Sequence, residues 1–154
     1  MGEAEALQVL APIPGRALPL AEVPDPVFAA AMVGPGAAVD PPRGPVQAVA
    51  PVDGQIAKLH PHAFVVVTAS GRGVLVHLGI DTVQLKGEGF RLLAAEGDQV
   101  AAGTPLVAWD AAAVEAGGRS PVSPVIALDA PPDAIGDAVT TGQVEAGAKL
   151  FVWQ

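Results

Sequence analysis

The stretch GRGVLVHLGIDTV, residues 71–83, combines a strand pattern with one titratable side chain. It opens on a turn-forming Gly-Arg-Gly, continues as an apolar run and carries a single imidazole near its centre. Because successive side chains of a strand point to opposite faces, Val74, Val76 and Leu78 are predicted to point into a core. Leu75 and His77 then share the other face, so we expect His77 to lie outside the core.

Short apolar segments separated by turn residues fill the rest of the chain. The 154 residues include 18 glycines and 16 prolines, and the segments between them are rich in Val, Leu and Ile. This punctuation predicts many short strands joined by tight turns, and no long helices. We expect strands over residues 7–11, 44–50, 54–59, 64–68, 73–77, 90–93, 105–109, 122–128 and 149–153.

Three further segments complete the predicted architecture. Residues 25–32 could form a helical turn from an Asp cap, and residues 110–116 a short helix closed by Gly117. Residues 35–45, rich in proline, are expected to form an ordered connection over the surface. The fold class is therefore all-β, an antiparallel β-sandwich or barrel-sandwich hybrid with short helical turns. We expect one domain over residues 7–154, preceded by a tail over residues 1–6.

The chain contains an internal repeat. QVAAGTPLVAW, from Gln99, and QVEAGAKLFVW, from Gln143, align without a gap and agree at Gln, Val, Ala, Gly, Leu and Trp. Such repetition predicts two related turn-and-strand units that need neighbours to bury their apolar faces. A sandwich or a partly closed barrel would contain such units.

Charge and cysteine content exclude several classes of function. The formal net charge is -8, which disfavours nucleic acid and anionic membrane surfaces and favours a partner with a basic face. There is no cysteine, so a thiol nucleophile and a cysteine zinc site are excluded. The acidic N-terminal segment does not resemble a secretory signal, and no apolar run reaches the ~20 residues of a membrane span. We expect a cytoplasmic protein without membrane insertion.

The three histidines are His60 and His62 on one side of a short turn and His77 on the other. If Phe64 pairs with His77 in an antiparallel hairpin, His62 faces Gly79 and lies diagonally across from His77. Both imidazoles then occupy one face, within reach of each other. Alternation adds His60 to the His62 side, whereas a register slip of one residue would separate His62 from His77.

Three kinds of chemistry could use such a cluster. His60, His62 and His77 could hold zinc with water in the fourth position, although no Glu flanks the pair to serve as a base. Ser70 and Ser120 lack a nucleophile elbow, which disfavours a hydrolytic triad. The third kind of chemistry is phosphoryl transfer, in which one imidazole accepts the phosphoryl group and another donates a hydrogen bond to the phosphoryl oxygens. This reaction depends on positioning and charge stabilisation.

The opening stretch resembles the signature around the phosphorylated histidine of the glucose-class IIA component of the bacterial phosphoenolpyruvate-dependent sugar phosphotransferase system. That signature is a glycine, two free positions, three apolar residues, His, apolar, Gly, apolar, a free position, Thr and apolar, and every position fits. The resemblance covers residues 7–153 and includes the segments VQLKGEGF (83–90), PVDGQI (51–56), HAF (62–64), DPVFA (25–29) and VGPGAAVDP (33–41).

The resemblance implies roles for two histidines. His77 would accept the phosphoryl group on Nε2, and His62 would hydrogen-bond the phosphate. Such a phosphotransferase component receives phosphate from the carrier HPr and passes it to the IIB domain of a sugar permease. It needs no metal or organic cofactor, and some relatives also regulate other proteins. The implied fold is an antiparallel β-sandwich.

The resemblance also implies a surface that binds partners. Asp25 and Asp81 match acids that surround the site and meet basic partner residues. Helix capping by Asp25 and a solvated turn at Asp81 are the alternative interpretations. Phe28, Leu59 and Leu75 would form an apolar rim that seats the partner and excludes water.

The sequence departs from the family pattern near the second histidine. His60 stands where Thr is common, and Leu59 and Leu75 stand where Phe is common. We expect His60 to support the site. The alternative function is a zinc-dependent hydrolase using the His60, His62 and His77 cluster, and His62 and His77 could also bind zinc incidentally. The sugar cannot be read from the sequence.

Overall fold

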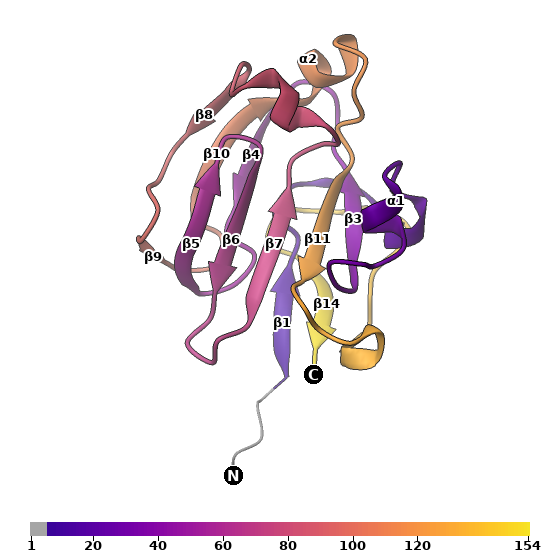
Figure 1. Ribbon diagram of the computed structural model, residues 1–154, viewed down its shortest axis with the longest axis vertical. Helices are drawn as coiled ribbons and strands as arrows, with labels where there is room; N and C mark the ends of the chain where they lie inside the picture. Colours follow the sequence, from indigo (N-terminus) through magenta and orange to yellow (C-terminus); the bar gives the residue numbers. More distant parts are fainter. Residues whose placement is uncertain (1–5) are drawn as a thin grey trace.

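The computed structural model describes residues 6–154, which form three antiparallel sheets and two short α-helices (Figure 1). Apart from Ala6, the predicted tail over residues 1–6 lies outside the described residues. None of the three sheets closes on itself, and the all-β prediction is confirmed. None of the helices in this range has the length and hydropathy that crossing a membrane requires.

The largest sheet has eight strands, in the order β13 (Gln143–Val144), β2 (Gly15–Pro19), β3 (Gly36–Asp40), β11 (Ser123–Ala127), β7 (Gly73–His77), β6 (Ala63–Val67), β5 (Gly54–His60) and β9 (Gln99–Val100). One small sheet has the order β1 (Leu7–Leu10), β14 (Lys149–Trp153) and β12 (Ile135–Gly136), and the other β4 (Pro45–Val49), β10 (Pro105–Asp110) and β8 (Phe90–Leu92). The helical elements are α1 (Pro26–Ala29), α2 (Ala111–Ala116) and the 3-10 turns η1 (Leu20–Glu22), η2 (Thr82–Leu85) and η3 (Pro132–Ala134).

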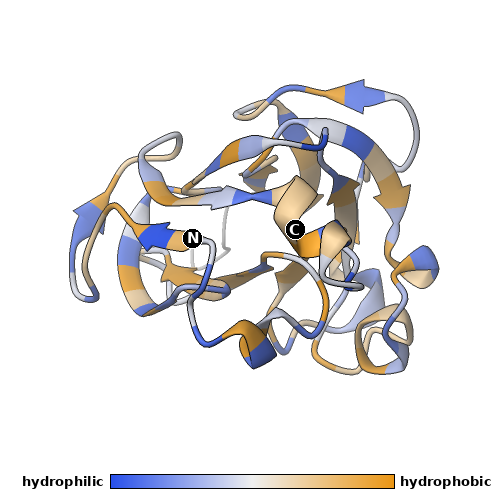
Figure 2. Ribbon diagram, turned by 90° about the horizontal axis from the view of Figure 1, so that it is seen from above, coloured by the Kyte–Doolittle hydropathy of each residue, from blue (hydrophilic) through white to orange (hydrophobic). Residues whose placement is uncertain are grey.

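Two hydrophobic cores lie on the two faces of the largest sheet. The larger core takes side chains from all three sheets, including Phe64, Val76, Leu106 and Phe151. The smaller core lies on the opposite face and takes side chains from η1, β2, β3 and β11, with Phe28 of α1 and Leu75 of β7 packed against it. Along the strands, hydrophobic and hydrophilic residues follow one another, as Figure 2 shows. Strand β11 serves both cores, because neighbouring side chains point to opposite faces: Val125 and Ala127 belong to the larger core and Ile126 to the smaller one.

The strand predictions are confirmed, with each end of the nine expected strands within one residue of its predicted place. The alternation in β7 is confirmed as well. Val74, Val76 and Leu78 are fully buried, whereas Leu75 and His77 are half-buried on the other face. Both helices form behind the predicted Asp caps, and Gly117 ends α2. Local patterns sufficed for these elements because each carries its own periodicity and boundary residues.

The prediction for residues 35–45 is wrong. Strand β3 runs through this segment and pairs with β2 and β11 inside the largest sheet. Its residues Ala37, Ala38 and Val39 are fully buried. The flanking prolines suggested a surface connection, but small side chains let this strand lie between two neighbours. The close approach of Gly36 to the Val125 carbonyl leaves no room for a Cβ atom.

The internal repeat is a structural repeat. One copy spans β9, a turn and β10, and the other spans β13, a turn and β14. The turn glycines make equivalent hydrogen bonds, from Gly103 N to Ala50 O at 2.9 Å and from Gly147 N to Ala11 O at 2.8 Å. The two copies therefore build the two small sheets in the same way, and each brings its tryptophan into the larger core.

Candidate functional site

The three histidines gather at one end of the largest sheet. His77 is the last residue of β7, His60 is the last residue of β5, and His62 lies in the turn between β5 and β6. The ring centroids of His62 and His77 are 5.3 Å apart, with the rings at 64°. The rings of His60 and His62 are nearly parallel, with centroids 5.7 Å apart. The structure thus brings all three predicted histidines together.

The predicted register between β6 and β7 is wrong by one residue. His77 pairs with Ala63, and Phe64 pairs with Val76. The two imidazoles still meet, because β6 begins at Ala63 and His62 lies in the turn that precedes it. Strand alternation therefore does not set the direction of the His62 side chain. The backbone of the turn is held by a hydrogen bond from Leu78 N to His62 O at 2.7 Å.

A backbone hydrogen bond fixes the tautomer of His77. Its Nδ1 lies 2.5 Å from the carbonyl oxygen of Gly79. Since a carbonyl oxygen only accepts, Nδ1 must carry the proton. In the neutral ring the lone pair then lies on Nε2, which makes no hydrogen bond to residues 6–154. His77 is therefore a half-buried imidazole whose nucleophilic nitrogen is defined by its surroundings.

Burial keeps both neighbouring imidazoles uncharged at neutral pH. It is the largest cause that lowers the pKa of His77 below its ordinary value of 6.5. The hydrogen bond to Gly79 and the charges of Asp25 and Asp81 act in the opposite direction and raise that pKa. The pKa of His62 is also lowered, first by burial and then by the charges of His77 and His60. Neutral rings can act as nucleophile and hydrogen-bond donor, as phosphoryl transfer to nitrogen requires.

The two predicted acids occupy different backbone settings. The Asp25 carboxylate accepts hydrogen bonds from Val27 N at 2.9 Å and Phe28 N at 3.3 Å, so it caps α1. Asp81 is exposed in a left-handed conformation, with φ of 60°, and makes no side-chain cap bond to η2. Asp25 therefore caps a helix and Asp81 lies in a solvated turn, as the alternative interpretations expect. The charges of both also raise the pKa of His77.

Two of the three predicted apolar rim residues lie on the histidine face. The Phe28 ring centroid is 5.3 Å from that of His77, and Leu75 packs at the edge of the smaller core. The prediction for Leu59 is wrong, because its side chain is 7% exposed and belongs to the larger core. A bulge in β5 interrupts alternation, and Leu59 pairs with buried Phe64.

Sequence reasoning missed three exposed apolar side chains on the elements that flank His77. Val27 on α1 is 45% exposed, Met32 just after α1 is 74% exposed, and Val83 on η2 is 55% exposed. The available signal was the position of Val27 inside DPVFA and of Val83 inside the stretch that carries His77, with Met32 three residues beyond DPVFA. Their exposure could not be inferred, since isolated surface hydrophobics are common.

The geometry gives no support to a metal centre. Within residues 6–154, no group of three or more His, Cys, Asp or Glu side chains is arranged to hold a metal ion. His60 stacks on His62, and His62 meets the edge of His77, so the imidazoles contact one another as rings. The zinc hydrolase alternative is not favoured.

An antiparallel sandwich that presents a neutral imidazole of fixed tautomer belongs to the class of sites that can use histidine as a nucleophile. Comparison with known families agrees with this class. The family described as "phosphoenolpyruvate-dependent sugar phosphotransferase system, EIIA 1" matches residues 7–131. The chain belongs to this EIIA family.

Individual relatives support the same assignment. The chain is 42% identical over 126 residues to a "PTS system glucose-specific EIIA component" of Oceanobacillus iheyensis, covering 80% of this chain and 75% of that protein. It is 39% identical over 146 residues to a "PTS system glucoside-specific EIICBA component" of Staphylococcus carnosus, covering 94% of this chain but only 21% of that protein. The solved glucose permease IIA of Mycoplasma capricolum has a TM-score of 0.88 and 35% identity, covering 98% of this chain and 97% of the other.

Family, relatives and fold together assign the general function. The chain is a phosphotransferase component with a role in phosphoryl transfer in the sugar phosphotransferase system. The predicted sandwich fold is confirmed by the match to a solved IIA structure.

Proposed function

We propose that this chain accepts a phosphoryl group from phospho-HPr on Nε2 of His77 and passes it to the IIB domain of a sugar permease. The Nε2 lone pair attacks phosphorus, an N–P bond forms, and the N–P bond of the donor histidine breaks as its imidazole leaves. In the second step a IIB thiolate attacks phosphorus and His77 leaves as a neutral ring. The hydrogen bond from Nδ1 to Gly79 O carries this proposal, because it leaves Nε2 as the nucleophile. No organic cofactor or metal takes part.

His62 is proposed to hydrogen-bond the phosphoryl oxygens. Its ring lies beside that of His77, and its lowered pKa leaves one nitrogen protonated and the other free at neutral pH. A ring N–H can therefore donate to the negative oxygens that His77 receives. His60 is proposed to support His62, since the two rings stack.

The surface around His77 suits a partner with a basic, partly apolar face. Phe28 and Leu75 lie on the histidine face, and Asp25 and Asp81 place negative charge close enough to affect His77. Apolar residues on α1 and η2 extend this surface, namely Val27, Met32 and Val83. The net charge of -8 would speed encounter with a basic carrier. We assign HPr and IIB to this one surface at successive steps.

The names of the longer relatives support IIB as a partner. The Staphylococcus carnosus relative is an EIICBA component, and a Corynebacterium glutamicum relative is a "PTS system mannose-specific EIIBCA component". The chain spans about a fifth of the length of these two relatives. We propose that residues 7–154 form one IIA domain acting in the cytoplasm. The printed names include glucose, glucoside and mannose, so they leave the sugar open.

The proposal is tested by following labelled phosphate from phosphoenolpyruvate through enzyme I and HPr to this protein. Wild type should be labelled and His77→Ala should be blank. His62→Gln should accept phosphate but pass it to IIB about 100-fold more slowly. His60→Thr serves as the histidine-loss comparison and should accept phosphate normally and lose far less of the transfer rate to IIB than His62→Gln. An unlabelled wild type with active donors, or a labelled His77→Ala, would overturn the proposal.

A further inference from the structure

Two polar side chains are buried at 0% exposure within residues 6–154, and both bind the backbone that follows His77. They are Thr82, at the start of η2, and Ser123, at the start of β11. A buried hydroxyl is costly unless it makes hydrogen bonds. Both hydroxyls make hydrogen bonds, and each has one partner within two residues of His77. Because both side chains bind the same short backbone segment, we ask what that segment does for His77.

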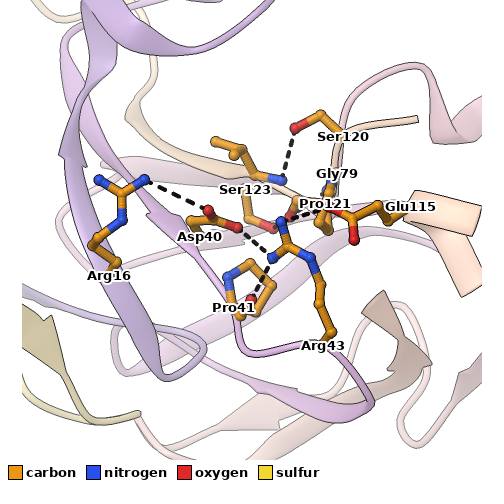
Figure 3. Close-up of polar contacts among 10 residues, drawn as sticks. Arg16, Asp40, Pro41, Arg43, Gly79, Glu115, Ser120, Pro121 and Ser123 are labelled. Atoms are coloured by element: carbon orange, nitrogen blue, oxygen red, sulfur yellow. Dashed lines mark hydrogen bonds and ion pairs between the residues drawn. The ribbon is translucent and has the colours of Figure 1, made fainter. Parts of the chain in front are cut away.

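The two hydroxyls hold the carbonyl and the N–H of one peptide group, the one that joins Leu78 to Gly79. Thr82 Oγ1 donates to Leu78 O at 2.7 Å. Gly79 N donates to Ser123 Oγ at 3.3 Å, and Ser123 Oγ donates to Pro121 O at 3.0 Å. Figure 3 shows Gly79, Pro121 and Ser123 lying together on this side of the molecule. Because a serine hydroxyl has one proton, its bond to Pro121 leaves it to accept from Gly79.

The same segments leave no room for a side chain at Gly79. Its φ is +81°, and a Cβ atom there would lie 2.8 Å from Thr82 Cγ2 and 2.9 Å from Ser120 O. The next residue is tied to the same loop by a hydrogen bond from Ile80 N to Ser120 O at 2.8 Å. The peptide groups on both sides of Gly79 are therefore held, the first by Thr82 and Ser123 and the second by Ser120, and the Gly79 carbonyl oxygen lies against His77 Nδ1.

We infer that Thr82 and Ser123 are positioning residues, which orient the Gly79 carbonyl and thereby hold His77 in the tautomer with its lone pair on Nε2. The inference rests on the proposed role of His77 as phosphoryl acceptor. If the carbonyl turned away, the neutral ring could carry its proton on Nε2, and that nitrogen would lose its nucleophilic lone pair. Both hydroxyls are fully buried, so they act on His77 through the Leu78–Gly79 backbone.

The test measures the tautomer directly, by ¹⁵N-edited NMR of the His77 ring in the unphosphorylated protein. Wild type should show a protonated Nδ1 above the pKa of His77. Ser123→Ala and Thr82→Val should each show a mixture of tautomers and accept phosphate from phospho-HPr on the order of 10-fold more slowly. Thr82→Ser restores the hydroxyl and should rescue both readouts.

Thr104→Val is the matched control. Thr104 Oγ1 donates to Ala101 O at 2.7 Å, the same kind of bond, in the turn between β9 and β10. This variant should retain the wild-type tautomer and rate. Folded Ser123→Ala and Thr82→Val proteins with an unchanged tautomer would overturn the positioning role. A changed tautomer together with a wild type that cannot be phosphorylated would support the positioning role and overturn the proposed function.

Discussion

The two segments that carry the neighbouring histidines are held in different ways. After His77 the backbone is fixed by buried hydroxyls and a left-handed glycine, and the ring is bonded to that backbone. His62 lies in a two-residue turn, and within residues 6–154 its ring contacts two other imidazoles and makes no hydrogen bond. One histidine is oriented by the backbone, and the other only by neighbouring rings.

This difference matches the two proposed roles. A nucleophile must present one nitrogen before its substrate arrives, so a fixed tautomer lowers the cost of reaching the transition state. A group that hydrogen-bonds phosphate meets oxygens in different places before and after each transfer. A ring in a turn can rotate to follow them. The fixed segment should therefore be sensitive to backbone changes, and the turn to changes in its neighbouring rings.

Gly79→Ala gives the largest expected effect, because it disturbs the fixed segment at its centre. Left-handed strain and two close contacts should lower the free energy of unfolding by about 3 kcal/mol and nearly abolish acceptance of phosphate. Chemical denaturation and the labelled-phosphate assay measure the two effects. Gly71→Ala is the control, since Gly71 has φ of +89° and open space around it. It should cost about 1 kcal/mol and leave acceptance intact.

Asp25→Ala separates the cap from the electrostatic role of the same carboxylate. Loss of the cap of α1 should lower the free energy of unfolding by about 1 kcal/mol. Loss of its charge should lower the pKa of His77 further, because Asp25 raises that pKa. Asp110→Ala removes the equivalent cap of α2. It should lower the free energy of unfolding by a similar amount and leave the pKa of His77 unchanged. An NMR titration of His77 showing equal pKa values in both variants would contradict an electrostatic role for Asp25.

The pH dependence of stability should report both histidines. His62 and His77 have lowered pKa values in the folded protein, so the unfolded chain takes up protons first as the pH falls below about 6.5. The stability that the two neutral rings contribute is therefore fully present above this pH. It is lost as the pH falls toward the pKa values of the folded protein. Denaturation curves recorded between about pH 7.5 and about pH 5 bracket the ordinary histidine pKa of about 6.5. They should show the free energy of unfolding falling as the pH is lowered. A His62→Gln, His77→Gln double variant with the same slope would refute the explanation.

His60→Ala should give the smallest effect, confined to the turn. Electrostatic repulsion from His60 is one cause that lowers the pKa of His62, so removing the His60 ring should raise that pKa. Transfer to IIB should slow by a factor of about 2 to 5, since an exposed stacked pair contributes little. His60→Lys places a positive charge at this position without the ring and should keep the pKa of His62 lowered. NMR titration of His62 in the two variants distinguishes charge from stacking.

Sequence patterns predicted the elements whose signals are local. The strand around His77 was placed correctly because its alternation, its flanking turn and its burial agree in one short stretch. The helix starting at Asp25 was found because an Asp cap followed by Pro is a local signal. Strand β3 was missed because its small residues resemble a connection until β2 and β11 are placed beside it. The burial of Leu59 was missed because a bulge leaves no clear mark in the sequence.

The sequence by itself determined the all-β class, the family and the identity of the two central histidines, since these depend on local periodicity and on a collinear motif. Only the tertiary structure decided how those histidines are held. The register between β6 and β7, the contacts of Ser123 with Gly79 and the stacking of His60 join residues that are separated in the chain or released from strand geometry. Hydrogen bonds between distant segments depend on packing of the whole sheet, so no local pattern encodes the tautomer of His77.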